Sequence, residues 1–213
     1  RARLRQHTNP LRGELMRPCD PPVWEEVFED PTLPVHLDIG CAFGELIREL
    51  AAGNKARNYI GVDVRTATIR HATASAEAAA LRNVLFVTTN VHASLGSLLG
   101  TLPAGVEVDT VSILHPDPWF KRRHEKRRVV TTEFMDRLAA YLPPGAAVLA
   151  QTDVEELYED IVEKVAGCTF FDREEDPVGP AFSDTPTSRE AIVLERGGSI
   201  HRLAYKRNGV SLP

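Results

Sequence analysis

The chain has 213 residues, a length that fits one domain with a full hydrophobic core. Its 43% hydrophobic and 26% charged residues are ordinary for a soluble globular protein, and no apolar run approaches the roughly 20 residues that a helix needs to cross a bilayer, which excludes a membrane-spanning helix. The formal net charge of −5 does not by itself suggest a nucleic-acid partner.

Strand-like and helix-like segments alternate along the chain. The predicted elements are, in chain order, a short helix at 23–28, a strand at 34–40, a helix containing 43–50, a strand at 59–64, a helix at 66–81, a strand at 84–89, a helix at 92–99, a strand at 108–114, a helix at 132–142, a strand at 146–151, a helix from 153 to 165, a strand at 168–172, a loop at 177–186 and a strand at 199–206.

This alternation predicts an α/β protein with one domain over 1–213. We expect a Rossmann-like, open sheet of seven mostly parallel strands with helices on both faces. Ligands in such sheets bind beyond the carboxyl ends of the strands. Three segments are candidates for functional parts: a basic arm at 1–20, a loop at 115–128 and a loop at 177–190.

The cysteines indicate a reducing compartment. Cys19, Cys41 and Cys168 are odd in number and widely spaced, which argues against a disulfide framework and against a zinc site. We expect reduced thiols, no metal, and an intracellular, cytoplasmic location. Because the chain begins at Arg1 and not at Met, an organellar location stays open.

A glycine-containing loop follows the first predicted strand. Gly40 and Gly44 have the spacing GxxxG, and Ala42 stands where the dinucleotide fingerprint G-x-G-x-x-G needs glycine, so an NAD-dependent oxidoreductase is disfavoured. A tight turn beside a nucleoside fits better. Asp63 ends the second strand, where a carboxylate can accept hydrogen bonds from both ribose hydroxyls.

Two further polar residues end strands at the same edge. Asp38 is either a partner for an ammonium group of the ligand or a strand-end carboxylate that faces water. Asn90 follows the third strand and either reaches an adenine amino group or is only a turn residue.

The segment 115–128 reads HPDPWFKRRHEKRR and leaves the end of the fourth strand. Trp119 and Phe120 offer flat faces on which a base can stack, and Asp117 can accept hydrogen bonds from a guanine edge. Six Lys or Arg residues within 121–128 provide phosphate contacts. The alternative is a loop with a structural tryptophan and a solvated charge run.

Four motifs in this order resemble those of bacterial-type tRNA (guanine-N7-)-methyltransferases, the TrmB family. The segment 116–128 is similar to PDPWxKxxHxKRR, and 5–11 (RQHTNPL) is similar to the amino-terminal RQHxNPL. Thr152-Asp153 resembles the family's TD, and 187–190 (TSRE) resembles its T-x-x-E. The resemblance implies a class I methyltransferase that moves a methyl group from S-adenosylmethionine to N7 of guanine in tRNA, at variable-loop position 46, and leaves S-adenosylhomocysteine. It implies no membrane partner, and either a monomer or a homodimer.

The resemblance also implies residue roles. Asp117 is the expected catalytic residue, expected to grip the guanine edge. The residues expected to hold the cofactor are Asp38, Gly40, Cys41, Ala42, Gly44, Asp63, Val64, Asn90, Val91 and His115. The expected substrate-binding residues are Lys121, Asp153, Thr187, Arg189 and Glu190. The residues expected to contact RNA are Arg123, His124, Lys126, Arg127 and Arg128.

The sequence departs from the family pattern at five positions. The family often has Glu in place of Asp38 and Asp63, Asp in place of Asn90, Gly in place of Ala42, and Phe in place of His115. These changes affect the cofactor side and leave the substrate-side carboxylates in place.

Some of these residues have plainer structural explanations. Asp153 with Glu156 fits a helix capping box, and Cys41 fits a small packing residue better than a nucleophile. His7 and Asn9 can simply pin the amino-terminal arm. The competing functions are methylation of an exocyclic amine of an RNA base and RNA binding without catalysis on the same scaffold.

Overall fold

The computed structural model describes residues 8–175 and 186–212. The expectations for the basic residues and the motif letters within 1–7, and for most of the predicted loop at 177–186, lie outside these ranges. Before the first strand, the described part of the chain forms two short helices, the 3-10 helix η1 (Gly13–Met16) and the one-turn helix α1 (Trp24–Val27).

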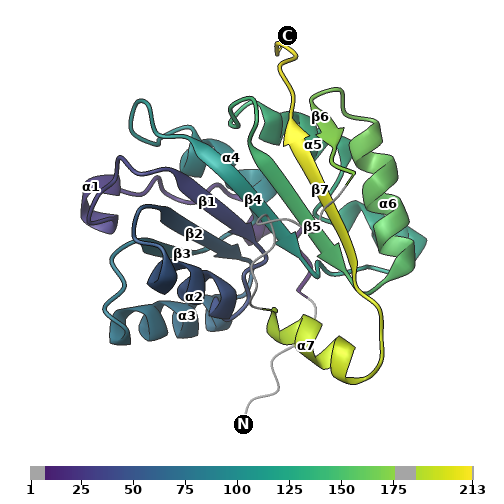
Figure 1. Cartoon of the computed structure of the whole chain (residues 1–213), viewed down its shortest axis with the longest axis horizontal. Coiled ribbons are helices and arrows are strands. Elements are labelled where there is room, and N and C mark those ends of the chain that lie inside the picture. Colours follow the sequence, from purple (N-terminus) through teal and green to yellow (C-terminus); the bar gives the residue numbers. More distant parts are fainter. Residues whose placement is uncertain (1–7, 176–185, 213) are drawn as a thin grey trace.

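Seven strands form one sheet in the order β3-β2-β1-β4-β5-β7-β6, as Figure 1 shows. Their bounds are β1 (Val35–Ile39), β2 (Asn58–Asp63), β3 (Val84–Thr88), β4 (Val108–Leu114), β5 (Ala147–Thr152), β6 (Phe171–Arg173) and β7 (His201–Arg207). The first five strands pair in parallel, and β7 runs antiparallel between β5 and β6. The prediction of a seven-stranded, mostly parallel sheet is confirmed.

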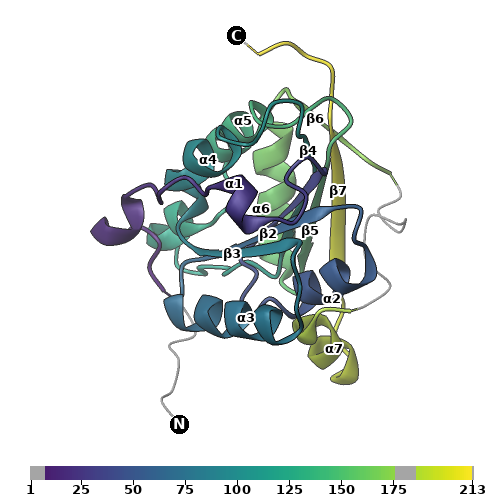
Figure 2. The ribbon, with the colours of Figure 1, turned by 90° about the vertical axis from the view of Figure 1, so that its left-hand side faces the viewer.

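Helices cover both faces of the sheet (Figure 2). The helices are α2 (Glu45–Gly53), α3 (Thr66–Ala78), α4 (Val91–Leu99), α5 (Thr132–Ala139), α6 (Glu155–Ala166) and α7 (Ser188–Glu195). The apolar faces of α2 and α3 pack with Tyr59 and Phe86 in a smaller core, and those of α4, α5 and α6 pack against the opposite face in a larger one. The two cores fix the positions of the strands, so the loops at the carboxyl ends of the strands start from well-packed residues.

The structure corrects the expected start of α6 and adds one helix, α7, to the predicted elements. Asp153 does not cap α6: the helix begins at Glu155, and the hydroxyl of Thr152 accepts a hydrogen bond from the Val154 amide instead. The capping box lies at α7, where Thr187 accepts from the Glu190 amide and Glu190 accepts from the Thr187 amide. The helix α7 was not predicted at all.

Candidate active site

Two cavities, each of about 480 Å³, open at the carboxyl ends of the strands. The α7 cavity is lined by the loops after β1, β4 and β5 and by the start of α7. The α4 cavity is lined by the ends of β2 and β3, the start of α4 and part of the amino-terminal segment. Both volumes suit a small ligand. The residues that line both cavities are Gly40, Arg65, His115, Pro116 and Asp117.

The loop after β1 approaches both cavities through its backbone. Gly40 has φ +83°, and a Cβ built there would meet nothing within 4 Å, so its bare backbone leaves room beside it. Gly44 has φ +65°, and a Cβ there would lie 2.4 Å from the ring of Phe86. Ala42 between them has φ 51°, a left-handed conformation that favours glycine. A glycine at this position would relieve the strain of this turn.

Asp38 is buried within β1 rather than facing water, so that alternative was wrong. It is 5% exposed and accepts a 2.6 Å hydrogen bond from the Ser112 hydroxyl, whose oxygen lies 2.9 Å from His36 Nε2. Burial raises the pKa of Asp38 to about 6, and the nearby charge of Asp63 adds to the rise, against the hydrogen bond from Ser112. Because burial disfavours the ionised form of Asp38, this carboxylate should bind a cationic group in the α7 cavity, which it lines.

Asp63 is held by four hydrogen bonds. Its two oxygens accept from the amides of Ala42 (3.1 Å) and Arg65 (2.8 Å) and from the Arg65 guanidinium at 2.9 and 2.8 Å. A carboxylate has about four lone-pair sites, so a ribose diol must share this acceptor or displace the guanidinium. The bond to Asp63 raises the pKa of Arg65, and the charge of Asp117 adds to this rise.

Asn90 is a helix cap and also pins the amino-terminal segment. Its Oδ1 accepts from the His92 amide at 3.0 Å, and its Nδ2 donates to the Pro10 carbonyl at 3.0 Å. Val64 and Val91 lie beside it in the wall of the α4 cavity. The amino-terminal segment is thus held next to the α4 cavity by Asn90. The role predicted for Asn90 toward adenine stays a prediction.

Cys41 packs into the sheet next to this loop. It is buried, and a Cβ at Gly61 would lie 2.9 Å from its Sγ. Burial raises the pKa of the thiol well above its usual value, with Asp38 and Asp63 adding to the rise. A thiol of this kind is a poor nucleophile at neutral pH, so the packing interpretation of Cys41 is supported.

The loop after β4 carries Asp117 between the two cavities. His115 and Trp119 flank it with left-handed φ values of 49° and 45°, so the backbone is kinked on both sides of Asp117. Trp119 lies under the Arg127 guanidinium, 4.9 Å from ring centroid to Cζ, and lines the α4 cavity. Phe120 is 65% exposed and lines the α7 cavity. Of the two aromatic faces predicted for stacking, Phe120 is the one on the side of the substrate carboxylates.

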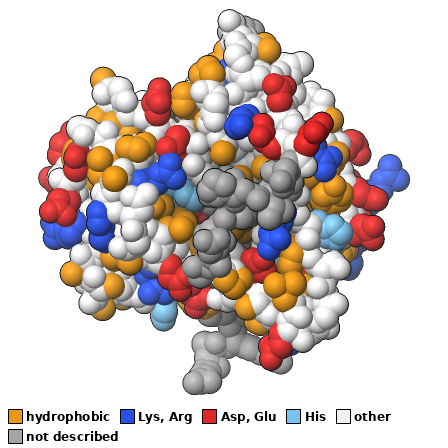
Figure 3. All heavy atoms as spheres, in the orientation of Figure 1, with side chains coloured by type: hydrophobic (Ala, Val, Ile, Leu, Met, Phe, Trp, Pro, Cys, Tyr) orange, Lys and Arg blue, Asp and Glu red, His pale blue; other side chains and the backbone are white. Residues whose placement is uncertain are grey.

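The basic run folds into the 3-10 helix η2 (Arg122–Arg127). Lys121, Arg123 and Lys126 are exposed, and His124 and Arg127 are half-buried. Arg128 is only 5% exposed, and it donates to the Pro118 carbonyl at 2.8 Å. On the face drawn in Figure 3, acidic and basic side chains are intermixed over the described residues.

Arg128 also pairs with two acidic residues of α6. Its guanidinium lies 2.8 Å from Glu156 and 3.1 Å from Asp160. The charge of Arg128 is therefore directed inward, and it ties the loop to α6, whereas the contact of Arg128 with RNA that the resemblance implies stays a prediction.

Replacing Arg128 with Met is expected to lower the free energy of unfolding by roughly 2–3 kcal/mol, because Asp160 loses its buried partner. The salt dependence of the tRNA binding that the resemblance implies should stay as it is. Lys126→Met is the matched control, with unchanged stability and a salt slope reduced by about 1 because one phosphate contact is lost. Urea unfolding and binding titrations over a range of salt check both. Equal losses of slope in the two variants would contradict the inward role of Arg128.

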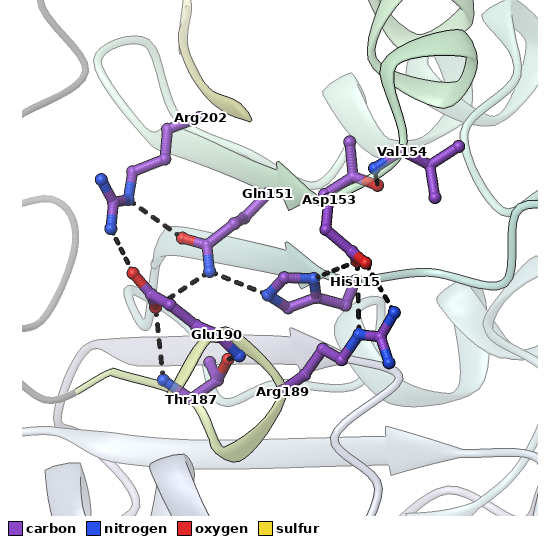
Figure 4. Close-up of polar contacts among 9 residues, drawn as sticks. His115, Gln151, Asp153, Val154, Thr187, Arg189, Glu190 and Arg202 are labelled. Atoms are coloured by element: carbon purple, nitrogen blue, oxygen red, sulfur yellow. Dashed lines mark hydrogen bonds and ion pairs between the residues drawn. The ribbon is translucent and has the colours of Figure 1, made fainter. Parts of the chain in front are cut away.

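A network of polar side chains forms the back of the α7 cavity (Figure 4). Asp153 accepts from the guanidinium of Arg189 at 2.5 and 3.3 Å and lies 3.1 Å from Nδ1 of His115. Burial opposes the ionisation of Asp153, yet the hydrogen bonds from Arg189 and His115 hold its pKa below the usual value. The loop after β4, the residue after β5 and the start of α7 are thereby joined.

Glu190 forms the second half of this network. Its carboxylate accepts from Gln151 Nε2 at 3.0 Å and from Arg202. Burial raises its pKa, but Gln151 and Arg202 outweigh this effect, so the pKa of Glu190 lies below its usual value. Sequence reasoning missed Gln151 and Arg202, which face each other across the antiparallel β5–β7 pair. A further bond from Ser188 to Glu45 ties α7 to α2.

The predicted site residues thus fall into three groups. Apart from Glu190, the residues that line neither cavity are Gly44, Lys121, Arg123 and His124. The other predicted loop residues after β1 to β4 and the carboxylates Asp38, Asp63 and Asp117 line the cavities. Asp153, Thr187 and Arg189 line the α7 cavity, and Glu190 is buried behind it. Among residues 8–175 and 186–212, no group of three or more His, Cys, Asp or Glu side chains is placed to hold a metal ion. In the same ranges, no helix is long and apolar enough to span a membrane.

Comparison with known proteins agrees with this arrangement. A family model described as "Putative methyltransferase" (Methyltransf_4) matches residues 32–203. A tRNA (guanine-N(7)-)-methyltransferase of Synechococcus sp. (strain WH7803) is 39% identical over 99% of this chain and 90% of the relative. The protein of that name from Thermosynechococcus vestitus is 38% identical over 98% of this chain and 96% of the relative.

Solved structures support the fold. An rRNA methylase from Streptococcus thermophilus matches with a TM-score of 0.52 at 12% identity, over 86% of this chain and 90% of that one. The 16S rRNA methyltransferase KamB matches with a TM-score of 0.53 at 18% identity, over 86% and 90% of the two chains. The fold is that of class I S-adenosylmethionine-dependent methyltransferases, and the full-length relatives show that the chain belongs to the tRNA (guanine-N7-)-methyltransferase family.

Proposed function

We propose that this chain transfers a methyl group from S-adenosylmethionine to N7 of a guanine in tRNA. The observation that carries the proposal is the position of Asp117, which lines both cavities at the point where the loop after β4 is kinked. A donor held on one side and a base held on the other would meet beside this carboxylate.

The residues around the α4 cavity fit the cofactor. The space beside Gly40 and the side chains of Asp63 and Asn90 suit a nucleoside in the α4 cavity. The buried carboxylate of Asp38 lines the α7 cavity, and it suits the cationic amino acid part of the ligand where the two cavities meet at Gly40. Asp63 and Asn90 would hold the ribose and adenine, and Asp38 would hold the ammonium group. When bound, S-adenosylmethionine supplies an electrophilic methyl group on a sulfonium.

On the substrate side, the protein has little proton chemistry to perform. N7 of guanine carries an in-plane lone pair and no proton, so attack needs no general base, and the ring gains positive charge. Asp117 would accept hydrogen bonds from the N1–H and the exocyclic amine and stabilise the developing cation. The larger contribution is orientation of N7 within the α7 cavity. Phe120 would stack on the base at its mouth.

The Arg-paired carboxylates have a different part. Asp153 and Glu190 already accept hydrogen bonds from Arg189 and Arg202, so their charges are compensated inside the protein. They would shape the α7 cavity and hold α7 in place rather than stabilise the guanine cation. The exposed Lys121, Arg123 and Lys126 would contact tRNA phosphates, which give affinity without sequence choice.

The experiment is to incubate the protein with methyl-labelled S-adenosylmethionine and unmodified tRNA and to identify the methylated nucleoside by mass spectrometry. Label in 7-methylguanosine is expected. Label on an exocyclic amine would replace N7 chemistry by the competing base methylation, and the absence of cofactor binding would point to RNA binding without catalysis. Cofactor binding without any transfer would point to a missing partner or a different RNA substrate. A tRNA with adenine at position 46 is the matched control, because it should accept no label if the variable-loop guanine is the target.

A further inference from the structure

His115 stands where the family pattern usually has Phe, and it lies at the centre of the network in Figure 4. Its Nδ1 lies 3.1 Å from an oxygen of Asp153, and its Nε2 lies 3.0 Å from Nε2 of Gln151. Its backbone amide donates to the Gln151 carbonyl at 2.6 Å. One residue thus joins the loop that carries Asp117 to Gln151 of β5 by two contacts and to Asp153, just after β5, by a third.

The orientation of the Gln151 amide is set by its other neighbours. Its Oε1 accepts from Arg202 Nε at 3.1 Å, and its Nε2 donates to Glu190 Oε2 at 3.0 Å. If the Gln151 amide were flipped, its NH₂ group would face the Arg202 guanidinium, donor against donor, and its oxygen would face the Glu190 carboxylate, acceptor against acceptor. The group that faces His115 is therefore the NH₂ of Gln151, which can only donate.

This arrangement assigns the tautomer of His115. Nε2 must carry a lone pair in order to accept from Gln151, so the ring proton lies on Nδ1 and is donated to Asp153. A second proton on Nε2 would face the NH₂ of Gln151, donor against donor. This clash between two donors would be relieved only if Gln151 broke its contacts with Glu190 or Arg202. Because Glu190 is the capping-box residue of α7, the loss of its contact would weaken the attachment of α7.

We propose that His115 is a positioning residue for the methyl transfer, active only as the neutral Nδ1–H tautomer, and that its protonation loosens α7 from the back of the α7 cavity. The groups that face it are Asp153 after β5, Arg189 and Glu190 of α7, and Arg202 of β7 through Gln151. Two acids and two cations leave no net charge to favour a cationic ring. Burial lowers the pKa of His115, and the bond to Asp153 only partly offsets this effect.

The positioning role follows from the backbone. His115 has a left-handed φ of 49°, a conformation that is unfavourable for residues other than glycine and that sets the direction of the chain toward Asp117. The ring contacts offset this cost. The role in methyl transfer rests on the proposed function, whereas the tautomer and the link to α7 do not.

The first test is the pH dependence of tRNA methylation at saturating cofactor and tRNA. kcat is expected to fall about tenfold per pH unit below the pKa of His115, as one proton inactivates the site. His115→Phe loses both ring contacts, and His115→Asn keeps a donor toward Asp153 without titrating. Both should lose this acid limb and at least ~10-fold of kcat at pH 8, with less loss for Asn. A surviving acid limb in both variants would overturn the proposal.

The second test needs no activity. In two-bond ¹H–¹⁵N spectra of the full chain, His115 should show the Nδ1–H tautomer at neutral pH, and the α7 amides should shift with the same titration. His71→Gln is the matched control, since that histidine is exposed and lines neither cavity. An Nε2–H tautomer, or α7 amides that do not move as His115 titrates, would overturn the inference. A correct titration without any 7-methylguanosine would support the link to α7 and place the failure with the proposed function.

Discussion

Asp117→Asn is expected to lower kcat for tRNA methylation by about 100-fold or more, with the Kd for S-adenosylmethionine changed less than about threefold. Asparagine has nearly the size and shape of aspartate, so the kinked loop between His115 and Trp119 should stay folded. The amide has one acceptor atom in place of two and no negative charge. It therefore loses both the paired hydrogen bonds to a guanine edge and the stabilisation of the cationic product ring.

The matched control lies at the other end of the same strand. Asp109 in β4 pairs with Arg57 and lines neither cavity, so Asp109→Asn should keep full turnover. Single-turnover assays with intact tRNA separate the transfer step from product release. Near-normal turnover by Asp117→Asn would show that orientation alone suffices and that Asp117 has no catalytic part.

The sheet and most helices were predictable because their apolar periodicity matches their burial. β1 is buried at every residue and α6 buries Leu157, Ile161 and Val165 at helical spacing. The helix α7 has no such signal: only Glu190 and Val193 are buried, and its capping box and polar network hold it. A helix stabilised by partners that are far away in sequence leaves no local pattern to read.

The capping-box error has a similar cause. D-x-x-E at 153–156 satisfies the motif, but α6 begins at Glu155 without a side-chain cap, and Asp153 instead contacts His115 and Arg189. The motif only shows that Asp153 could cap the helix, and its contacts with His115 and Arg189 determine the position of its carboxylate in the folded protein.

The residues of the candidate site that lie at strand ends were predictable from the strand order. The hydrogen bonds and ion pairs among their side chains were less predictable. The carboxyl-end rule placed Asp38, Asp63 and Asp117 at one edge. In contrast, nothing in a run of six cations marks Arg128 as the one that turns inward to Asp160. The Gln151–Arg202 contact depends on the antiparallel register of β7, which the sequence does not display.

Asp38→Asn is expected to have two large effects of opposite sign. Burial raises the pKa of Asp38 to about 6 from an ordinary value of 3.8, so the folded protein holds this proton more tightly than the unfolded chain does. Its contribution to stability is therefore full below pH ~4 and is lost as pH rises through about 6. On the order of 2–3 kcal/mol separates the two limits.

Asparagine removes that charge while its Oδ1 can still accept from Ser112. Without cofactor, Asp38→Asn should thus unfold at higher urea than the wild type at pH 8, and the two should converge near pH 4. Cofactor binding should change the other way, because the ammonium group of S-adenosylmethionine loses its counter-charge: an affinity loss of about 100-fold is expected at pH 8. In the wild type, affinity should fall as pH drops below about 6, and in Asp38→Asn it should be weak and flat.

Calorimetric titration of cofactor between pH 5 and about pH 8, with urea unfolding at the same pH values, checks both effects. Asp109→Asn again serves as the control, because that carboxylate is paired outside the cavities. A variant that is less stable at pH 8 and still binds cofactor normally would mean that Asp38 is a structural carboxylate held for Ser112 and not for a ligand. If Asp38→Asn is more stable and also binds the cofactor more weakly, Asp38 lowers the stability of the unliganded protein and serves to bind the cationic group of the ligand.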